Sequence, residues 1–267
     1  IPNELIESVP PKMLAIIVAA YKEEDVIEDV INNLMISTHY PHSMFHLFIG
    51  VYPNDPETSN ICLKLSEKYK NVHAVTHVIP GPSSKADNIN NVVDNIKVFE
   101  KQNNIEFKAI VIHDSEDVVH PYEFTLENYL LEEHPAIQIP VFPLIEKPRF
   151  GNIFKNMVTS TYADEFAENH YRMMPIRNST KAFVPSAGTG FAIRRDVIEA
   201  FSDEEFFPVG SLTEDYKLSF EFKKRGFDLY YPLEYVKRIN YEGKEVREYI
   251  ATRSMFPRSY SAAVRQK

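Results

Sequence analysis

The sequence contains little cysteine, tryptophan or glycine. Among 267 residues there is one cysteine, Cys62, no tryptophan, and eight glycines against eighteen prolines. A single cysteine excludes an internal disulfide framework and suits a reducing compartment. The excess of proline over glycine indicates rigid, defined loops.

The sequence also lacks a basic excess and a membrane-spanning segment. It has 29 Lys and Arg against 38 Asp and Glu, a formal charge of −9. This charge argues against general nucleic-acid binding, which requires a basic face. The longest apolar run, residues 13–20, is far shorter than the about 20 residues that span a bilayer. There is no signal peptide, and the first residue is not methionine. With the missing tryptophan, these features predict a piece excised from a longer protein.

What the sequence does contain is a regular alternation of strand and helix patterns. Hydrophobic residues make up 44% of the chain, which is ordinary for a globular protein. The alternation predicts an α/β fold with a mostly parallel sheet. No linker divides the chain, so we expect one domain in two lobes. Strands are expected near 14–20, 45–52, 72–78, 107–113, 136–142, 188–193 and 230–231, and helices near 26–34, 57–69, 85–99, 121–133, 150–174 and 213–224.

The stretch from residue 110 to 119 is the most informative. It begins as a buried β-branched run and then carries Asp114, Glu116 and Asp117 within four positions. In open α/β sheets, ligands bind at the carboxyl ends of the strands. Carboxylate oxygens at this spacing suit Mg²⁺ or Mn²⁺, which bind through one or two carboxylates plus substrate phosphates. On these residues alone, a solvated acidic turn remains the alternative.

Several short motifs stand in one order along the chain, and their order and spacing are more specific than any one of them. Together they resemble the family 2 glycosyltransferases of the GT-A fold, which include cellulose synthase, and particularly bacterial membrane glycosyltransferases of the phage adsorption protein B type. The resemblance covers residues 13–267. The motifs are Ala20-Tyr21-Lys22-Glu23-Glu24, Tyr52-Pro53-Asn54-Asp55, Ser84-Lys85-Ala86-Asp87-Asn88-Ile89-Asn90, His113-Asp114-Ser115-Glu116-Asp117, Gly188-Thr189-Gly190-Phe191, Thr213-Glu214-Asp215 and Met255-Phe256-Pro257-Arg258.

The resemblance implies a single GT-A domain over residues 1–267. Residues 1–130 would bind the nucleotide-sugar and residues 131–267 would face the acceptor. The implied donor is a UDP-sugar, the acceptor is a glycan or a lipid-linked molecule, and the cofactor is Mg²⁺ or Mn²⁺. The implied location is the cytoplasmic face of the bacterial inner membrane, with attachment through segments outside this chain.

The resemblance also assigns donor-binding residues. The ring of Tyr21 would pack on the uracil, with Glu23 or Glu24 beside the nucleoside, and Asp55 would bind the uracil edge or the ribose. Residue type alone favours other roles, namely a core-covering ring for Tyr21 and a turn former for Asp55. The family usually has asparagine where this chain has Lys22.

The phosphate and metal assignments come from the next motifs. Lys85 would meet the donor diphosphate, where the ammonium and a helix N-terminus act together. Asp114 and Glu116 match the Asp-x-Asp motif, with Glu116 as the main metal ligand and Ser115 beside the donor. For Asp117, a supporting role behind the metal ligands and a helix cap remain equally open. His113 is expected to pack on the opposite strand face.

The acceptor-side assignments lie in the second half. Asp215 would be the general base and Glu214 could hold an acceptor hydroxyl, although both acids would also suit a helix start. Gly188 and Thr189 would border the acceptor sugar, and the neighbouring Phe191 is expected in the core. Arg258 belongs to a basic, aromatic tail, which could lie on an anionic membrane face or pack on its own domain.

These assignments predict a metal-dependent inverting hexosyltransferase of cell-surface polysaccharide synthesis. A catalytically silent nucleotide-sugar-binding module is the alternative, and it would not need Asp215. A nucleotidyltransferase would share the α/β architecture. It would carry a Gly- and Arg-rich loop after the first strand, which residues 21–25 do not form.

Overall fold

The structure, a computed structural model, describes residues 1–144, 163–201, 206–208, 210, 214–239 and 243–254. Its centre is a seven-stranded sheet in the order β3-β2-β1-β4-β7-β5-β8. The four strands from β3 to β4 in this order are parallel to one another. β7 lies between β4 and β5 and is antiparallel to both, and β8 is parallel to β5. The predicted mostly parallel α/β sheet is confirmed. The strands are β1 (Leu14–Ala19), β2 (Phe45–Val51), β3 (Val72–Thr76), β4 (Ala109–Asp114), β5 (Ala136–Gln138), β7 (Phe191–Arg194) and β8 (Leu229–Tyr230).

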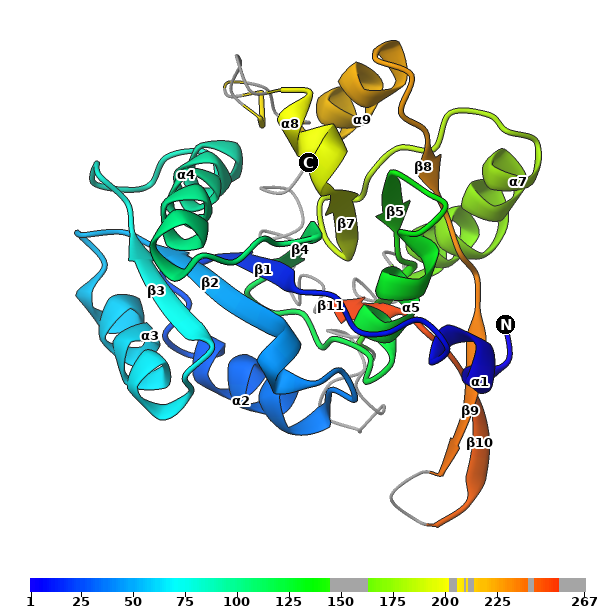
Figure 1. The fold of residues 1–267 in the computed structure, drawn as a ribbon, viewed down its shortest axis with the longest axis horizontal. Helices are drawn as coiled ribbons and strands as arrows, with labels where there is room; N and C mark the ends of the chain where they lie inside the picture. Colours follow the sequence, from blue (N-terminus) through cyan, green and yellow to red (C-terminus); the bar gives the residue numbers. More distant parts are fainter. Residues whose placement is uncertain (145–162, 202–205, 209, 211–213, 240–242, 255–267) are drawn as a thin grey trace.

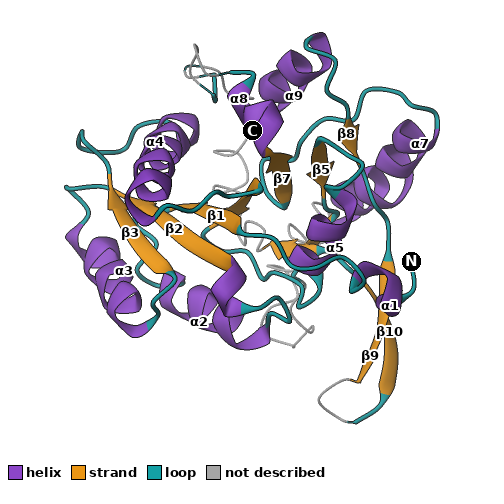
Figure 2. Ribbon diagram, viewed as in Figure 1, coloured by secondary structure: helices purple, strands orange, loops and turns teal. Residues whose placement is uncertain are grey.

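Helices cover both faces of this sheet (Figure 2). One face carries α2 (Ile27–Ser37), α3 (Pro56–Lys68) and α5 (Glu123–Leu130). The other carries α4 (Lys85–Asn103), α8 (Arg195–Glu199) and α9 (Glu214–Lys224). Successive residues of β1 point alternately into the hydrophobic cores on the two faces of the sheet, so the strand is buried on both sides. This two-sided burial explains why β1 and β4 are continuous apolar runs in the sequence.

Two predicted strands differ from the observed ones. The segment expected at 136–142 splits into β5 and β6 (Val141–Pro143), and β6 leaves the central sheet to pair with β11 (Thr252–Ser254). Pro140 separates the two, and proline has no N–H with which to continue a ladder. The strand expected from Gly188 begins only at Phe191, because Gly188 and Gly190 have φ angles of 77° and 57°.

Several short elements were not predicted. They are α1 (Asn3–Ile6), a 3₁₀ turn (His42–Met44), α7 (Met174–Ser179), α8, and the hairpin of β9 (Tyr235–Ile239) and β10 (Glu245–Tyr249). A π-helical turn (Asn169–Met173) lies within the helix expected over 150–174. The hairpin projects from the body of the protein (Figure 1). The helix expected over 150–174 is helical from residue 163, and its earlier part lies outside the described residues. None of the helices in the described part of the chain is long and apolar enough to cross a bilayer.

The core under α5 contains a carboxyl group with no hydrogen-bond partner among the residues that the structure describes. Glu127 is fully buried, and its two oxygens accept no hydrogen bond from the described residues. Burial, reinforced by the nearby charge of Glu123, raises the pKa of Glu127 well above its usual value of 4.5. Burial therefore favours the protonated form of this side chain.

We expect Glu127→Gln to stabilise the protein more at pH 8 than at pH 5. The folded-state pKa lies above the unfolded-state value, so folding takes up a proton. Above pH 4.5 this uptake costs up to about 1.4 kcal/mol per pH unit, until the folded-state pKa is reached. Glutamine does not titrate. Urea unfolding at both pH values measures the effect, with the exposed Glu133→Gln as control. An equal stability difference at both pH values would contradict the assignment.

Candidate active site

The carboxyl ends of β1, β2 and β4 open into a cavity of about 320 Å³. Its lining contains six of the predicted donor and metal residues, which come from three separate segments of the chain. Two tyrosines stand at its side, with the ring centroids of Tyr21 and Tyr52 5.3 Å apart in an edge-to-face arrangement. The six predicted residues are Tyr21, Glu23, Lys85, Asp114, Ser115 and Glu116.

A second, smaller cavity of about 170 Å³ contains the predicted base. Asp215 and Glu214 line it from the first turn of α9, together with Gly188. A Cβ atom built on Gly188 would lie 3.2 Å from Asp215 Oδ2, so the two residues are in close contact. Lys85 lines both cavities. The donor-side acids and the candidate base therefore meet around one lysine.

Lys85 is the first residue of α4, which Ser84 caps by accepting a hydrogen bond from Asp87 N at 3.1 Å. The ammonium forms an ion pair with Asp114 and donates to Gly188 O at 2.8 Å. Burial alone would lower the pKa of Lys85, but Asp114 and more distant acids outweigh it and raise the pKa above the usual value. The lysine is therefore a fixed positive charge between the two cavities.

The acids of the larger cavity crowd one another. Burial, followed by the charges of Asp114 and Glu23, raises the pKa of Glu116 to about 7. Burial also raises the pKa of Glu23, and it outweighs a hydrogen bond from Ser115 that acts in the opposite direction. Burial raises the pKa of Asp114 as well, and it outweighs the charge of Lys85, which lowers this pKa. Three carboxylates thus share one ammonium. This excess of negative charge is the environment that a divalent cation would relieve.

The same acids have the right chemistry for such a cation without forming a complete cage. In the described ranges, no three His, Cys, Asp or Glu side chains are grouped closely enough to hold a metal by themselves. Mg²⁺ normally takes one or two carboxylates and completes its shell with water and substrate phosphates. Glu116 and Asp114 fit that incomplete site.

Two predicted site residues have other contacts in the structure, and their ligand-binding roles stay predictions. Asp55 does not line the cavity, because its carboxylate caps α3 and accepts a 2.6 Å hydrogen bond from Lys22 N. That bond holds Lys22 at a φ of 59°, so Asp55 shapes the Tyr21 loop from behind. Thr189 is 4% exposed, and its hydroxyl donates to Asp117 rather than facing an acceptor. Arg258 and Thr213 lie outside the described residues.

Asp117 supports the acidic loop and caps no helix. Its carboxylate is buried and accepts hydrogen bonds from Asp114 N at 3.0 Å and from the Thr189 and Ser254 hydroxyls. His113 is buried behind it, as predicted, with Nδ1 3.4 Å from Asp117 Oδ2. Of the two roles left open by the sequence, these contacts favour support of the acidic loop, and the place of Asp117 behind the metal ligands stays a prediction.

Two polar residues of the site were missed in the sequence. Gln138, at the end of β5, is fully buried and bonds to the turn before β7, with Ala187 N and Thr189 O both 2.7 Å from its amide. Ser219 of α9 accepts from Ser186 N and donates to Asp215 O, both at 2.8 Å. The one sequence signal for Gln138 is its place as a polar residue at the end of an apolar strand. Ser219 has no such sequence signal, because its bond to Ser186 forms only when α9 packs beside that residue.

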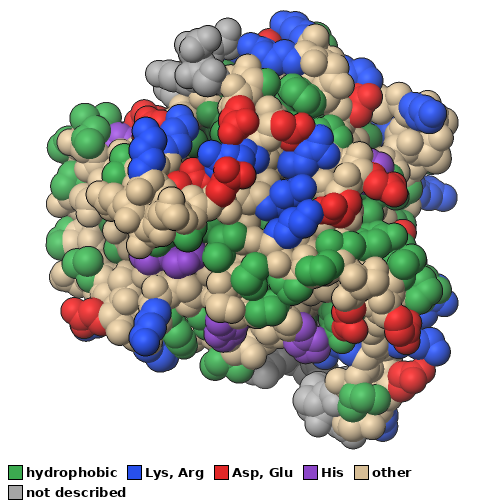
Figure 3. Space-filling model, viewed as in Figure 1, with side chains coloured by type: hydrophobic (Ala, Val, Ile, Leu, Met, Phe, Trp, Pro, Cys, Tyr) green, Lys and Arg blue, Asp and Glu red, His purple; other side chains and the backbone are tan. Residues whose placement is uncertain are grey.

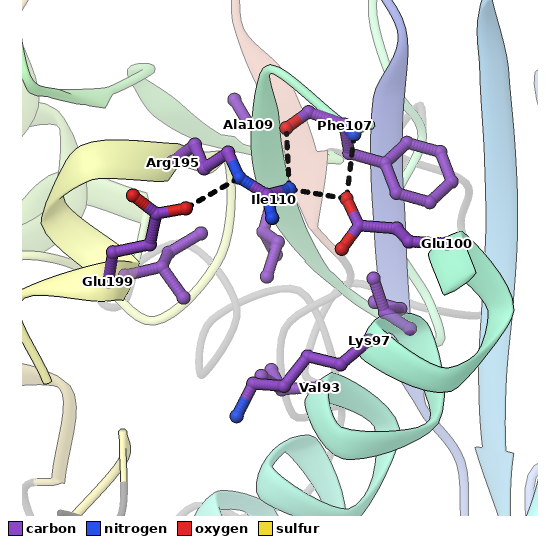
Figure 4. Close-up of a pocket in the computed structure, with 10 residues that line it drawn as sticks. Val93, Lys97, Glu100, Phe107, Ala109, Ile110, Arg195 and Glu199 are labelled. Carbon is purple, nitrogen blue, oxygen red and sulfur yellow. Dashed lines mark hydrogen bonds and ion pairs between the residues drawn. The ribbon is translucent and has the colours of Figure 1, made fainter. Parts of the chain in front are cut away.

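A further cavity, of about 310 Å³, lies between α4 and α8 and does not have the chemistry of the active site (Figure 4). Its floor is apolar, with Phe107, Ala109 and Ile110. The charge at its mouth is already paired, because Arg195 bridges Glu100 at 2.5 Å and Glu199 at 2.7 Å. On the surface in Figure 3, basic and acidic side chains likewise lie among one another. Within the described residues, the acidic edge of the sheet is thus the best candidate site.

Comparison with known proteins gives the family. A profile described as "Glycosyltransferase like family 2" matches residues 10–267. The chain therefore belongs to glycosyltransferase family 2. It is 38% identical over 267 residues to bacteriophage adsorption protein B of Escherichia coli strain K12, and equally to bacteriophage N4 adsorption protein B of strain O157:H7. These matches cover 96% of this chain and 35% of each relative, so the chain spans about a third of their length.

Solved structures confirm the GT-A fold. The mannosyltransferase PcManGT from Pyrobaculum calidifontis, in complex with GDP-Man and Mn²⁺, matches with a TM-score of 0.58 and 15% identity, over 88% of this chain and 61% of that one. Glucosyl-3-phosphoglycerate synthase from Mycobacterium tuberculosis, with Mn²⁺ and UDP, has a TM-score of 0.51 and 13% identity, over 86% and 71%. S. aureus TarS with UDP-GlcNAc has a TM-score of 0.51 and 14% identity, over 92% and 59%.

Proposed function

We propose that this chain transfers a hexose from a UDP-sugar to an acceptor hydroxyl with inversion of the anomeric centre. The observation that carries the proposal is the position of Lys85, which lines both the acidic cavity and the cavity of Asp215. A sugar bridging the two would have its diphosphate by the lysine and its anomeric carbon toward the base. Family membership supports a transferase, and the solved structures in complex with nucleotide-sugars support this type of donor.

On the donor side, Tyr21 would pack on the nucleobase and Glu23, with Ser115, would bind the nucleoside. Lys85 would exchange part of its contact with Asp114 for a diphosphate oxygen, since an ammonium binds phosphate as a point charge. Glu116, with Asp114, would hold Mg²⁺ or Mn²⁺, which would neutralise charge developing on the leaving diphosphate.

On the acceptor side, Asp215 would accept the proton of the attacking hydroxyl. Glu214, on the same first turn of α9, would hold the hydroxyl in line. The hydroxyl oxygen then bonds to the anomeric carbon as the bond to the diphosphate breaks, which inverts the centre. Lys85 stabilises the negative charge that the diphosphate gains, a charge that is largest in the transition state.

The wider role is also a proposal. Because the relatives are bacteriophage adsorption proteins, we propose a glycan or lipid-linked acceptor and work in cell-surface polysaccharide synthesis. The reaction would take place at the cytoplasmic face of the inner membrane. Residues 1–130 would serve the donor and 131–267 the acceptor. A silent nucleotide-sugar-binding module is the second candidate. The close contact of Asp215 with Gly188, beside Lys85, favours the enzyme.

Calorimetric titration of the purified protein tests the proposal. We expect UDP and at least one UDP-sugar to bind at least tenfold more tightly with Mn²⁺ than with EDTA, because the acidic cavity opposes a diphosphate unless a cation is present. GDP-mannose serves as the comparison donor, since one neighbour was solved with it. Absence of UDP binding in the presence of Mn²⁺ would contradict the proposed function. Tighter binding of GDP-mannose than of any UDP-sugar would show that the donor is a GDP-sugar.

A further inference from the structure

One buried carboxylate joins three segments of the chain that are far apart in the sequence. Asp117 Oδ2 accepts from Asp114 N, within its own loop, and from the hydroxyl of Thr189, which is 72 residues away. Asp117 Oδ1 accepts from the hydroxyl of Ser254, which is 137 residues away in β11. Asp117 is 1% exposed. A carboxylate so deeply buried persists only when donors surround it, so all three contacts are strong constraints.

The turn of residues 186–190, called here the glycine turn, extends this connection toward the base. Ser186 Oγ accepts from Gly188 N at 3.0 Å, and Ser186 N donates to Ser219 Oγ. The Ser219 hydroxyl in turn donates to Asp215 O. Together with the Thr189–Asp117 bond, these contacts form a continuous path. It leads from the acidic loop through the glycine turn to the helix that carries the candidate base.

Two simpler roles for Asp117 explain less. Joining β11 to the acidic loop does not require it, because Val118 and Arg253 already exchange two backbone hydrogen bonds of 2.8 and 3.0 Å. Pairing with His113 does not account for the geometry either, since that contact is the longest one Asp117 makes, at 3.4 Å. What Asp117 adds is a charge-assisted bond to the hydroxyl of the glycine turn, beside the 3.2 Å hydrogen bond that Asp114 N donates to the same hydroxyl.

We propose that Asp117 is a positioning residue that fixes the acidic loop relative to the glycine turn, and through that turn sets the distance from the metal ligands to Asp215. The roles of the metal ligands and of Asp215 in this inference rest on the proposed function, whereas the hydrogen bonds of Asp117 do not. Asp117 itself would touch neither donor nor acceptor. Losses from removing the supporting partner of a metal ligand are about 10- to 100-fold in metal affinity or activity.

Thr189 supplies the test, because it can be changed in two matched ways. Thr189→Val keeps the shape and removes the hydroxyl, whereas Thr189→Ser keeps the hydroxyl. Ser254→Ala removes the other donor, and Ser66→Ala, which removes a hydroxyl bonded to Cys62 O in α3, is the control. We expect Thr189→Val and Ser254→Ala to weaken Mn²⁺ binding in the presence of UDP at least tenfold, measured by electron paramagnetic resonance. Thr189→Ser and Ser66→Ala should stay within twofold of the original protein.

Hydrogen–deuterium exchange separates this inference from the proposed function. Thr189→Val should speed exchange in peptides spanning 112–118 and 186–190 by at least tenfold, while Thr189→Ser and β2 peptides remain unchanged. Unchanged exchange in Thr189→Val, or equal effects of Val and Ser, would overturn the positioning role, whether or not UDP binds. If the unsubstituted protein bound no UDP while exchange responded as expected, the proposed function would fail and the positioning role would stand.

Discussion

Replacing Asp215 by asparagine is expected to lower the rate of sugar transfer by about 100- to 10,000-fold and to leave UDP affinity within about threefold. Asparagine keeps the size of the side chain and its place at the start of α9, but it cannot accept a proton from the acceptor hydroxyl. General base catalysis contributes about 10²- to 10⁴-fold to such reactions. Release of UDP from the bound UDP-sugar measures the rate, and calorimetry with UDP and Mn²⁺ measures the affinity.

Asp228→Asn is the matched control for this substitution. Asp228 follows the same helix, its side chain is 70% exposed, and it pairs with Lys223 on the surface. The control changes the charge by the same amount near α9 and should leave the rate within twofold. An Asp215→Asn protein that turns over normally would remove Asp215 from the base role. Loss of UDP binding in that variant would instead place Asp215 on the donor.

Replacing Glu116 by glutamine is expected to weaken Mn²⁺-dependent UDP binding by about 100-fold. Losing a direct carboxylate ligand should cost at least as much as losing an outer-shell partner, whose removal costs about 10- to 100-fold. Glutamine has nearly the same shape as glutamate, so the cavity itself should persist. Titration of the Glu116→Gln protein with UDP at fixed Mn²⁺ measures the change.

Glu106→Gln provides the charge-matched comparison, because the Glu106 side chain is 75% exposed and lies outside the lining of the acidic cavity. It should bind UDP as the unsubstituted protein does. Unaltered UDP affinity in Glu116→Gln would shift the metal to Asp114 or Glu23. Equal weakening with and without Mn²⁺ would show that Glu116 contacts the nucleotide instead.

The parts of the fold predicted best are the strands that are buried along nearly their whole length. β1, β2 and β4 are mainly apolar, because helices cover both faces of the sheet, and such runs are read directly from sequence. The short β6, β9, β10 and β11 have no such pattern. Their positions depend on tertiary contacts, such as the departure from the sheet at Pro140, and no local periodicity records these.

The site divides in the same way. Lys85, Asp114, Glu116 and Asp215 converge where the motif order placed them, because each stands at a strand end or a helix start. The fate of Asp55 could not be read from its motif, since one carboxylate can bind a ligand or cap a helix, and only the structure shows which donors reach it. Gln138 was missed for a related reason, because four of its five hydrogen bonds go to residues 186–190, which only folding brings beside it.

The reversed direction of β7 has a consequence for how the site is assembled. Ile112 of β4 pairs with Phe191 and Ala109 pairs with Arg194, so the start of β7 lies beside the end of β4. A parallel strand at this position would have delivered its leading loop to the far edge of the sheet. A single antiparallel insertion therefore lets the second half of the chain enter the catalytic edge directly, without a crossover helix. The edge with the acidic loop is thus completed by a segment that comes from the second half of the chain.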